Sequence, residues 1–297
     1  MLRNNTDTTL AVWRLFGLLI AGMLLAQLGG SWILKAVYGE EALGSLKELG
    51  TRHPAAWIWI RGIQVAHAVF SMLLPALIIN KSVTGKWWPA HDPGEQSPWM
   101  PLVMIPVMLF SFMPLMQTLY VFNQQLRFPG IMQDILMKME IEMNGMVEGM
   151  LADMSVPAIM ANVFIIVILA AVCEELFFRG VLQRLLARKI DIHIAIFISA
   201  FAFSTIHMQF FGFLPRLALG VLFGYIYMRT NRMTAPIFAH ATFNAVQLAS
   251  YYYAKSIGQG TGQDAFLMPV SFTVSFTFMF LMLYFIFHTY TSKNKPA

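Results

Sequence analysis

Charged residues and cysteine are scarce in this chain of 297 residues. Only 12% of the residues are Asp, Glu, Lys or Arg, whereas 58% are hydrophobic, and the mean hydropathy is +0.62. This composition excludes a soluble domain and is typical of a polytopic membrane protein. The single cysteine, Cys173, excludes an internal disulfide bond. The sequence also lacks internal repeats and low-complexity linkers, so we treat it as one domain.

Long apolar stretches predict an all-α fold, a polytopic transmembrane helical bundle. About 20 apolar residues are needed to cross a ~30 Å hydrocarbon core. We expect eight spans. The sixth is short and needs residues 213–215 or its flanking residues to cross the membrane. The first is expected to be a retained anchor rather than a cleaved signal peptide. The eight stretches are Leu10 to Leu34, Trp57 to Ile79, Trp99 to Phe122, Pro157 to Phe178, Ile192 to Phe213, Leu217 to Met228, Ala235 to Ala254, and Phe266 to Phe287.

Lysine and arginine are distributed unequally between the two ends of these spans. One side would carry Arg3, Lys81, Lys86, Arg184, Arg188, Lys189, Arg229, Arg232, Lys293 and Lys295. The other side would carry Lys35, Lys47, Arg52, Arg127, Lys138, Arg216 and Lys255. The more basic side, with both termini, is expected to be cytoplasmic. The formal net charge of +5 then reflects the orientation of the chain in the membrane, and we expect no nucleic-acid partner.

The pattern of apolar and polar residues divides the chain into four parts. Residues 1–130 are expected to form a transmembrane scaffold of three spans, and 157–255 a core of four spans that carries three ionisable clusters. Residues 256–297 hold the last span and a cytoplasmic tail. Between scaffold and core, residues 131–156 repeat methionines and other apolar side chains at helical spacing, which predicts an amphipathic interfacial helix. A methionine-lined groove for peptides is the alternative for this helix.

Ionisable side chains inside the fourth span are the clearest sign of chemistry, because such groups are costly at bilayer depth and usually functional. Glu175 and Arg179 stand four residues apart and can pair on one helix face. Glu174 points about 100° away and is left without an intrahelical partner. A free carboxylate in an apolar setting can act as a general base.

Two further polar pairs occur at the same spacing. Phe203 and His207 would share a face of the fifth span, and His240 and Asn244 would offer two hydrogen-bond donors on the seventh. If spans four and five form a hairpin that turns at residues 189–191, Glu174 and His207 lie 16 and 17 residues from its midpoint. They would then face each other at one depth, with His240 at a similar level, which predicts a single site on the cytoplasmic side.

Three motifs in this order resemble those of the CAAX protease and bacteriocin-processing family of intramembrane endopeptidases. The motifs are Glu174-Glu175-x-x-x-Arg179-Gly180-x-Leu182, Phe203-x-x-x-His207 and His240-x-x-x-Asn244. The resemblance covers about residues 157–255 and implies an eight-helix bundle whose interior cavity opens towards the cytosol. The residues before this segment match no family that we can name.

The resemblance also implies roles for these residues. Glu174 and His207 would activate a water molecule for attack on a peptide carbonyl, while His240 and Asn244 would stabilise the oxyanion. Supporting positions are expected at Glu175, Arg179 and Phe203. Relatives in eukaryotes remove the last three residues of prenylated proteins, but the short loops here are more like those of bacterial members. We therefore expect an inner-membrane enzyme that acts on membrane-associated peptides or proteins within the lipid bilayer.

Other chemistry is open to the same residues. Glu174, His207 and His240 could be three zinc ligands with an open fourth position. No His-Glu-x-x-His helix accompanies them, so metal-free glutamate catalysis, without a cofactor, is favoured. Cys173 could be a nucleophile with His207, but it lies on a different helix face in apolar surroundings that disfavour a thiolate.

Other functions are open as well. Intramembrane acids and histidines also build proton relays, and Gly220, Gly224 and Pro236 could mark the interrupted helices of a transporter. The absence of repeated halves argues against a transporter. A catalytically silent scaffold or immunity factor on the same fold is the third possibility, and the intact motifs argue against it.

Overall fold

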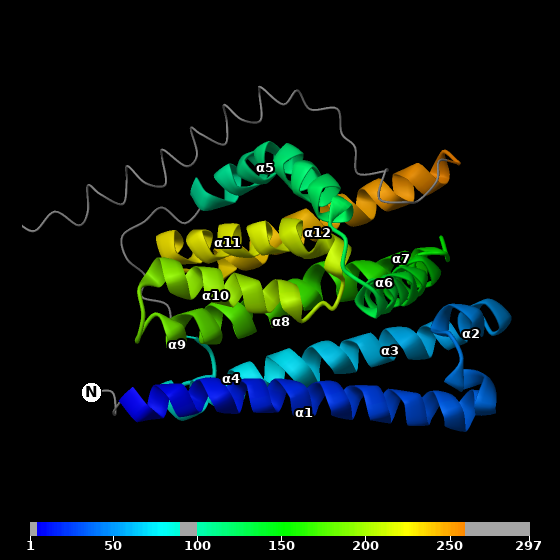
Figure 1. Ribbon diagram of the computed structural model, residues 1–297, viewed down its shortest axis with the longest axis horizontal. Coiled ribbons are helices and arrows are strands. Elements are labelled where there is room, and N and C mark those ends of the chain that lie inside the picture. Colours follow the sequence, from blue (N-terminus) through cyan, green and yellow to red (C-terminus); the bar gives the residue numbers. More distant parts are fainter. Residues whose placement is uncertain (1–4, 90–99, 259–297) are drawn as a thin grey trace, which may run out of the picture.

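The computed structural model describes residues 5–89 and 100–258, and every regular element within them is helical (Figure 1). Some of the helices run directly into one another through short π-helical stretches. The elements are α1 (Asn5–Tyr38), η1 (Gly39–Leu43), α2 (Leu46–Arg52), α3 (Ala56–Ala68), η2 (Val69–Leu73), α4 (Leu74–Thr84), α5 (Met100–Gln125), α6 (Ile131–Met150), α7 (Val156–Asn162), η3 (Val163–Leu169), α8 (Ala170–Glu175), η4 (Leu176–Gln183), α9 (Arg184–Leu186), α10 (Ile192–Thr205), η5 (Phe210–Gly212), α11 (Phe213–Thr230) and α12 (Thr234–Ser256).

Five helical segments are long and apolar enough to cross a membrane. They are Thr8–Ala42, Ala56–Thr84, Ile105–Gln125, Val156–Leu186 and Phe210–Thr230. The shorter α10 and the helix α12 stand at the positions of the fifth and seventh predicted spans. The predicted all-α polytopic bundle is therefore confirmed. The eighth predicted span, Phe266 to Phe287, lies outside the described residues.

The fifth predicted span is wrong at its end. It was expected to reach Phe213, but α10 ends at Thr205 and Met208 adopts a left-handed conformation with φ of 55°. Residues 210–212 form a short 3-10 turn that leads into α11. Pro215 would break a helix that continued from α10, whereas it is well tolerated in the first turn of a new one. The sixth span borrows residues 213–215, as predicted.

The two helices of the first hairpin, α1 and the continuous α3–η2–α4 segment, lie side by side along one edge of the bundle (Figure 1). Their contact is close, since a Cβ on Gly22 would lie 2.1 Å from the carbonyl oxygen of Phe70. Leu15 of α1 packs into the same hydrophobic core as Phe177 and Phe178 of η4, and all three are fully buried. The N-terminal helices thus form one wall against the segment that carries the first motif.

Helices α10 and α11 pack closely together at two glycines of α11 that are four residues apart. A Cβ on Gly220 would lie 2.9 Å from the Cβ of Ala200, and one on Gly224 would lie 2.7 Å from Cγ2 of Ile196. Small residues at this spacing let transmembrane helix backbones approach closely. As a result, the backbone carbonyls of Gly220 and Gly224 lie within reach of side chains from η4.

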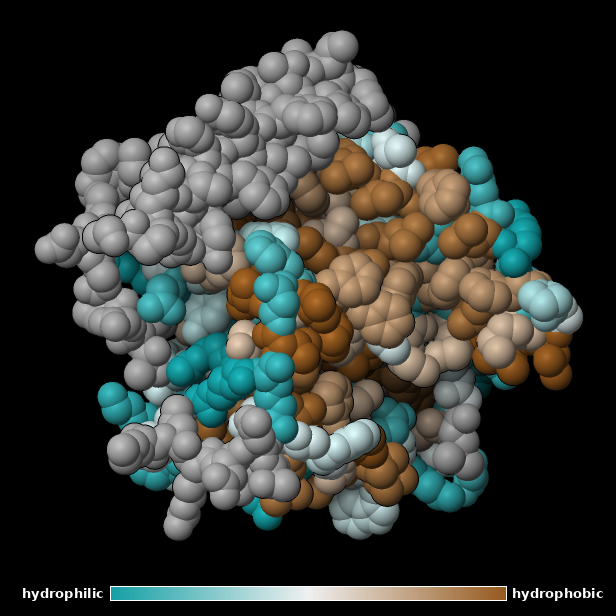
Figure 2. Space-filling view, turned by 60° about the vertical axis from the view of Figure 1, so that its left-hand side comes forward, coloured by the Kyte–Doolittle hydropathy of each residue, from teal (hydrophilic) through white to brown (hydrophobic). Residues whose placement is uncertain are grey.

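Apolar side chains cover much of the outer surface (Figure 2). Trp13, Leu28, Val156 and Met160 are each about two-thirds exposed or more, with exposed fractions of 71%, 67%, 68% and 66%. A soluble monomer rarely exposes such large contiguous apolar areas. Contact with lipid chains accounts for this surface, so the chain is an integral membrane protein.

A helix is present in the predicted range 131–156 as α6, which ends earlier, at Met150. Its buried face includes Gly145, Gly149 and Met150, and the polar Glu140 is also buried there. A Cβ on Gly149 would clash with the Trp57 ring at 2.0 Å, so the helix packs tightly against α3. Other members of the predicted stripe, Met132, Ile135 and Val147, are exposed.

Candidate active site

Two neighbouring glutamates at the junction of α8 and η4 have different surroundings. Glu175 Oε1 accepts hydrogen bonds from Arg179 Nη1 at 2.8 Å and from His240 Nδ1 at 2.8 Å. The side chains of Glu175 and Arg179 are fully buried. The i,i+4 pair predicted from the sequence is therefore present, and it is joined by His240 of α12 through a contact that the sequence analysis did not predict.

Arg179 is held from several directions. Its Nη2 donates to the carbonyl oxygen of Gly220 at 2.8 Å, and its guanidinium carbon lies 4.9 Å from the ring centre of Phe203 and 5.5 Å from that of Phe223. A buried cation is tolerated only when it is paired and hydrogen-bonded. One turn further along η4, Gln183 Nε2 donates to the Gly224 carbonyl at 3.2 Å, which repeats the link to α11.

Glu174 lacks such partners within residues 5–89 and 100–258. Its buried Oε2 atom has no hydrogen-bond partner there and lies 3.8 Å from Nε2 of His207 and 3.8 Å from Nε2 of His240. Its side chain is 13% exposed, compared with 27% for His207. An unpaired buried carboxylate oxygen is costly and needs an explanation. Distances of 3.8 Å are too long for direct hydrogen bonds, but a small polar molecule can contact such groups together.

His207 lies in the turn after α10, not on a helix as predicted, yet it remains beside Phe203. The two ring centres are 5.0 Å apart, and His207 Nδ1 lies 2.7 Å from the carbonyl oxygen of Phe203. A carbonyl oxygen can only accept a hydrogen bond, so this contact assigns the proton to Nδ1. In the neutral imidazole the lone pair of Nε2 then faces Glu174.

His240 is buried and tightly oriented. Its ring stacks on Phe223 at 5.1 Å with an interplanar angle of 24° and meets Phe203 edge-on at 5.8 Å. Because the carboxylate of Glu175 accepts from Nδ1, the opposite nitrogen, Nε2, points towards Glu174. The structure thus brings together Glu174, Glu175, Arg179, Phe203, His207 and His240, all predicted from the sequence.

Asn244 was expected to act beside His240 as a hydrogen-bond donor, but one of its N–H groups already has a partner. Its Nδ2 donates a hydrogen bond to the carbonyl oxygen of Ile166 in η3 at 2.9 Å. An amide nitrogen carries two N–H groups, so one remains for another acceptor. Asn244 is partly buried and stands one helical turn from His240. The i,i+4 spacing places both on one side of α12, but the structure shows no direct contact between Asn244 and Glu174.

Arg216, at the start of α11, is a residue near the site that the sequence analysis missed. It donates to the backbone oxygen of Gln209 at 3.3 Å and to the side-chain Oε1 of Gln209 at 3.1 Å. Its charge acts on Glu174, His207 and Glu140. The distribution of basic residues predicted that Arg216 lies on the side of the membrane opposite to the cytoplasm, and no motif surrounds it. Only the short turn after α10 brings it to the site.

The predicted zinc alternative depends on the same three side chains, Glu174, His207 and His240. Nε2 of His207 and Nε2 of His240 each lie 3.8 Å from Oε2 of Glu174. Among residues 5–89 and 100–258, no group of three His, Cys, Asp or Glu side chains is arranged to hold a metal ion. The zinc alternative stays a prediction.

The predicted thiol alternative has no support in the geometry. Cys173 is fully buried. Its neighbour Glu174, not Cys173, lies near His207. A buried apolar cysteine is usually inert.

Comparisons with known proteins bear on the same part of the chain. Residues 156–246 match the sequence model of a family described as type II CAAX prenyl endopeptidase Rce1-like. A stretch of 77 residues is 34% identical to YdiL of Bacillus subtilis (strain 168), which carries the name of a membrane peptidase. The match covers 26% of this chain and 32% of that relative, so the chain matches about a third of the relative's length. No solved structure gives a significant match.

Proposed function

We propose that this protein is an intramembrane endopeptidase, since residues 156–246 belong to the CAAX protease and bacteriocin-processing family. One observation carries the proposal. The buried Oε2 of Glu174 has no hydrogen-bond partner and lies between two imidazole nitrogens at 3.8 Å. A water molecule bound there would satisfy the orphaned oxygen and would be held by a base.

The proposed reaction begins with that water. Glu174 takes a proton from it, and the lone pair on Nε2 of His207 accepts a second hydrogen bond that orients it. The water oxygen then adds to the carbonyl carbon of the substrate and forms a tetrahedral oxyanion. When the carbon–nitrogen bond breaks, Glu174 returns the proton to the departing amine. Atoms and charges balance with no other reactant.

His240 is proposed to stabilise the oxyanion, and Glu175 would make this possible. Because Nδ1–H donates to Glu175, Nε2 can donate to an oxyanion only when the ring carries a second proton. The negative carboxylate beside Nδ1 stabilises such an imidazolium, as the buried carboxylate of a catalytic triad does. Arg179 shares the same oxygen of Glu175 and fixes its position. The remaining N–H of Asn244 would be a second donor.

The substrate is proposed to be a membrane-associated peptide or protein, because Glu174, Glu175 and Arg179 lie in a segment, Val156–Leu186, that is long and apolar enough to cross the bilayer. An inner-membrane location in a bacterium, with both termini in the cytoplasm, is part of this proposal. Quantitative proteomics of membrane-protein termini tests it directly. Cells that carry the wild-type chain should show new termini that are absent from cells with the Glu174→Gln variant. Identical termini in both would contradict peptide hydrolysis, and solute flux that depends on Glu174 would favour a transporter instead.

Replacing Asn244 by alanine tests the second oxyanion donor. We expect kcat to fall about 10²-fold with little change in KM, the lower end of the effect of losing one such donor, because one N–H already serves Ile166. Asn244→Asp should be worse, since it places negative charge where negative charge develops. Gln247→Ala, which removes an exposed amide from the same helix, is the matched control. A rise in KM alone would show that Asn244 binds the ground state of the substrate.

Chelators separate the glutamate mechanism from the zinc alternative. We expect the purified protein to keep its peptidase activity after prolonged treatment with a strong zinc chelator and dialysis, because no step in the proposed reaction uses a metal. Elemental analysis of the same sample gives the metal content per chain. Loss of activity that added Zn²⁺ restores would instead assign Glu174, His207 and His240 as ligands.

A further inference from the structure

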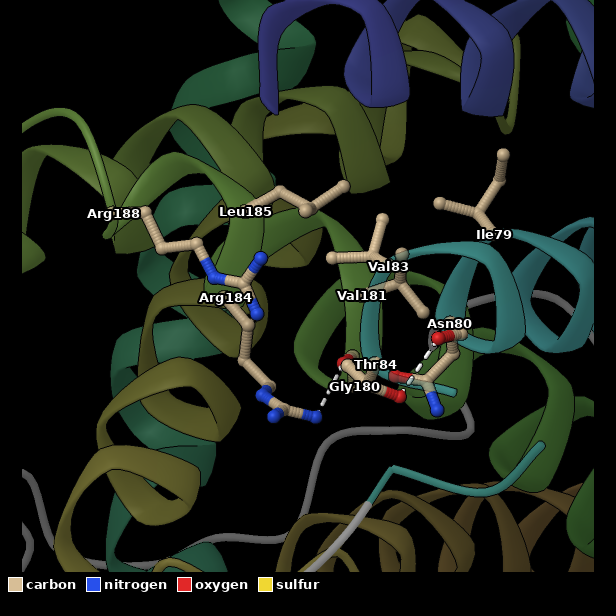
Figure 3. A pocket seen from close by; sticks show the side chains of 9 residues that line it. All are labelled: Ile79, Asn80, Val83, Thr84, Gly180, Val181, Arg184, Leu185 and Arg188. Carbon is tan, nitrogen blue, oxygen red and sulfur yellow. Dashed lines mark hydrogen bonds between the residues drawn. The ribbon is translucent and has the colours of Figure 1, made fainter. Parts of the chain in front are cut away.

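A small recess lies at one end of the bundle, between α4 and the segment formed by η4 and α9 (Figure 3). It is separate from the Glu174 cluster and shares no residue with it. Its apolar wall is formed by Ile79, Val83, Val181 and Leu185. Its volume is about 10 Å³, enough for a single water molecule. A larger ligand must therefore bind at the mouth of the recess and insert only its edge.

Two arginines stand at this mouth. Figure 3 shows Arg184 and Arg188, one helical turn apart, on the same side of the recess. Arg184 makes one long hydrogen bond, from Nη1 to the Gly180 carbonyl at 3.4 Å, which involves no acidic group. Within the described part of the chain, neither arginine forms an ion pair. Burial and the charge of Arg184 together lower the pKa of Arg188. An anion between the two guanidinium groups would relieve their repulsion.

The position of the recess is that of a membrane interface. The transmembrane segments Ala56–Thr84 and Val156–Leu186 both end beside it. The exposed Trp87 and Trp88 follow the first of these segments, and Lys81 Nζ lies 5.6 Å from the Trp87 ring centre. Tryptophan and lysine are enriched where lipid headgroups meet the hydrocarbon core. The recess therefore faces the depth at which phosphate groups lie.

We propose that this recess binds the headgroup of an anionic phospholipid, with the phosphodiester between Arg184 and Arg188 and the first methylenes of the lipid against the apolar wall. Arginine suits this role because its fork of N–H groups matches phosphate oxygens. Basic pockets between transmembrane helices are known to bind such headgroups. A free phosphate would gain the charge contacts but would leave the apolar wall unused. This proposal stands apart from the peptidase reaction and does not depend on it.

Thermal unfolding of the full chain in a neutral detergent tests the site. Phosphatidylglycerol, phosphatidylcholine and inorganic phosphate are titrated separately, and the apparent affinity is taken from the rise in melting temperature. We expect phosphatidylglycerol to stabilise the protein more than the other two. The double variant Arg184→Gln/Arg188→Gln should bind phosphatidylglycerol roughly 10- to 30-fold more weakly, since each basic residue near a membrane surface contributes a several-fold factor.

The control is Arg14→Gln, which removes the charge of an exposed arginine from α1 and should leave the affinity unchanged. Equal stabilisation of the double variant and the wild type would overturn the proposal. Equal protection by inorganic phosphate would overturn the lipid assignment and leave a free-anion site. If the double variant does not fold, the single variant Arg188→Gln tests the proposed lipid site. Its side chain is exposed, and its affinity should fall about fivefold; an unchanged value would reject the site.

Discussion

Replacing Glu174 by glutamine is expected to lower turnover by about 10²- to 10⁴-fold while the protein stays folded. The amide keeps the size and hydrogen-bonding capacity of the side chain but cannot take a proton from water. Among the residues that the structure describes, Glu174 has no ion pair or hydrogen bond closer than the two 3.8 Å contacts with His207 and His240. Stability should therefore change little or even rise, because an unpaired buried carboxylate is removed. Single-turnover peptide cleavage and thermal melting measure the two effects.

The matched control is Glu142→Gln, which neutralises an exposed glutamate on α6 and should leave both quantities unchanged. His207→Ala should lower turnover to a similar extent as Glu174→Gln, and the double variant should be little worse than either single one, since both residues act on one water molecule. Near-normal cleavage by a folded Glu174→Gln protein would end the glutamate mechanism. Additive losses would mean that the two residues act in different steps.

Local spacing predicted most of the site. Glu175 and Arg179 pair because four residues make nearly one helical turn, and Glu174 is excluded from the pair for the same reason. The hairpin between α9 and α10 turns at residues 187–191, where Asp191 caps α10 by accepting from the backbone N–H of His193. Glu174 and His207 lie 15 and 18 residues from the midpoint of this turn, which brings Nε2 of His207 to 3.8 Å from Oε2 of Glu174. The family resemblance read from these motifs is confirmed for residues 156–246.

Contacts between distant segments could not be predicted in this way. Helical periodicity says which residues share a face, but not which face meets which neighbour. The hydrogen bond that His240 Nδ1 donates to Glu175 Oε1 depends on how α12 packs against α8, and no pattern within either helix encodes it. The end of α10 at Thr205 was missed because the apolar run continues through Phe210 and Phe211. That early end is what places Arg216 near His207.

Removing the guanidinium of Arg179 is expected to destabilise the protein by about 3 to 5 kcal/mol, the usual cost of leaving one partner of a buried ion pair alone. Arg179→Ala would leave Glu175 fully buried with only His240 to compensate its charge. It would also free the Gly220 carbonyl on α11 and the rings that pack on the guanidinium. The melting temperature should fall by several degrees or more.

Arg52→Ala, which removes an exposed arginine whose ion pair with Glu41 is 3.9 Å long, is the control and should cost at most about 1 kcal/mol. Arg179→Lys should recover part of the stability, because it keeps the charge but cannot reach Glu175 and Gly220 in two fixed directions. Activity of Arg179→Ala should fall as well, even below its melting temperature, because Glu175 would no longer hold His240 in one orientation. Equal shifts in melting temperature for Arg179→Ala and Glu174→Gln would show that Glu175 has been wrongly assigned as the partner of Arg179. A stable but inactive Arg179→Ala protein would contradict the expected stabilising role of the buried ion pair.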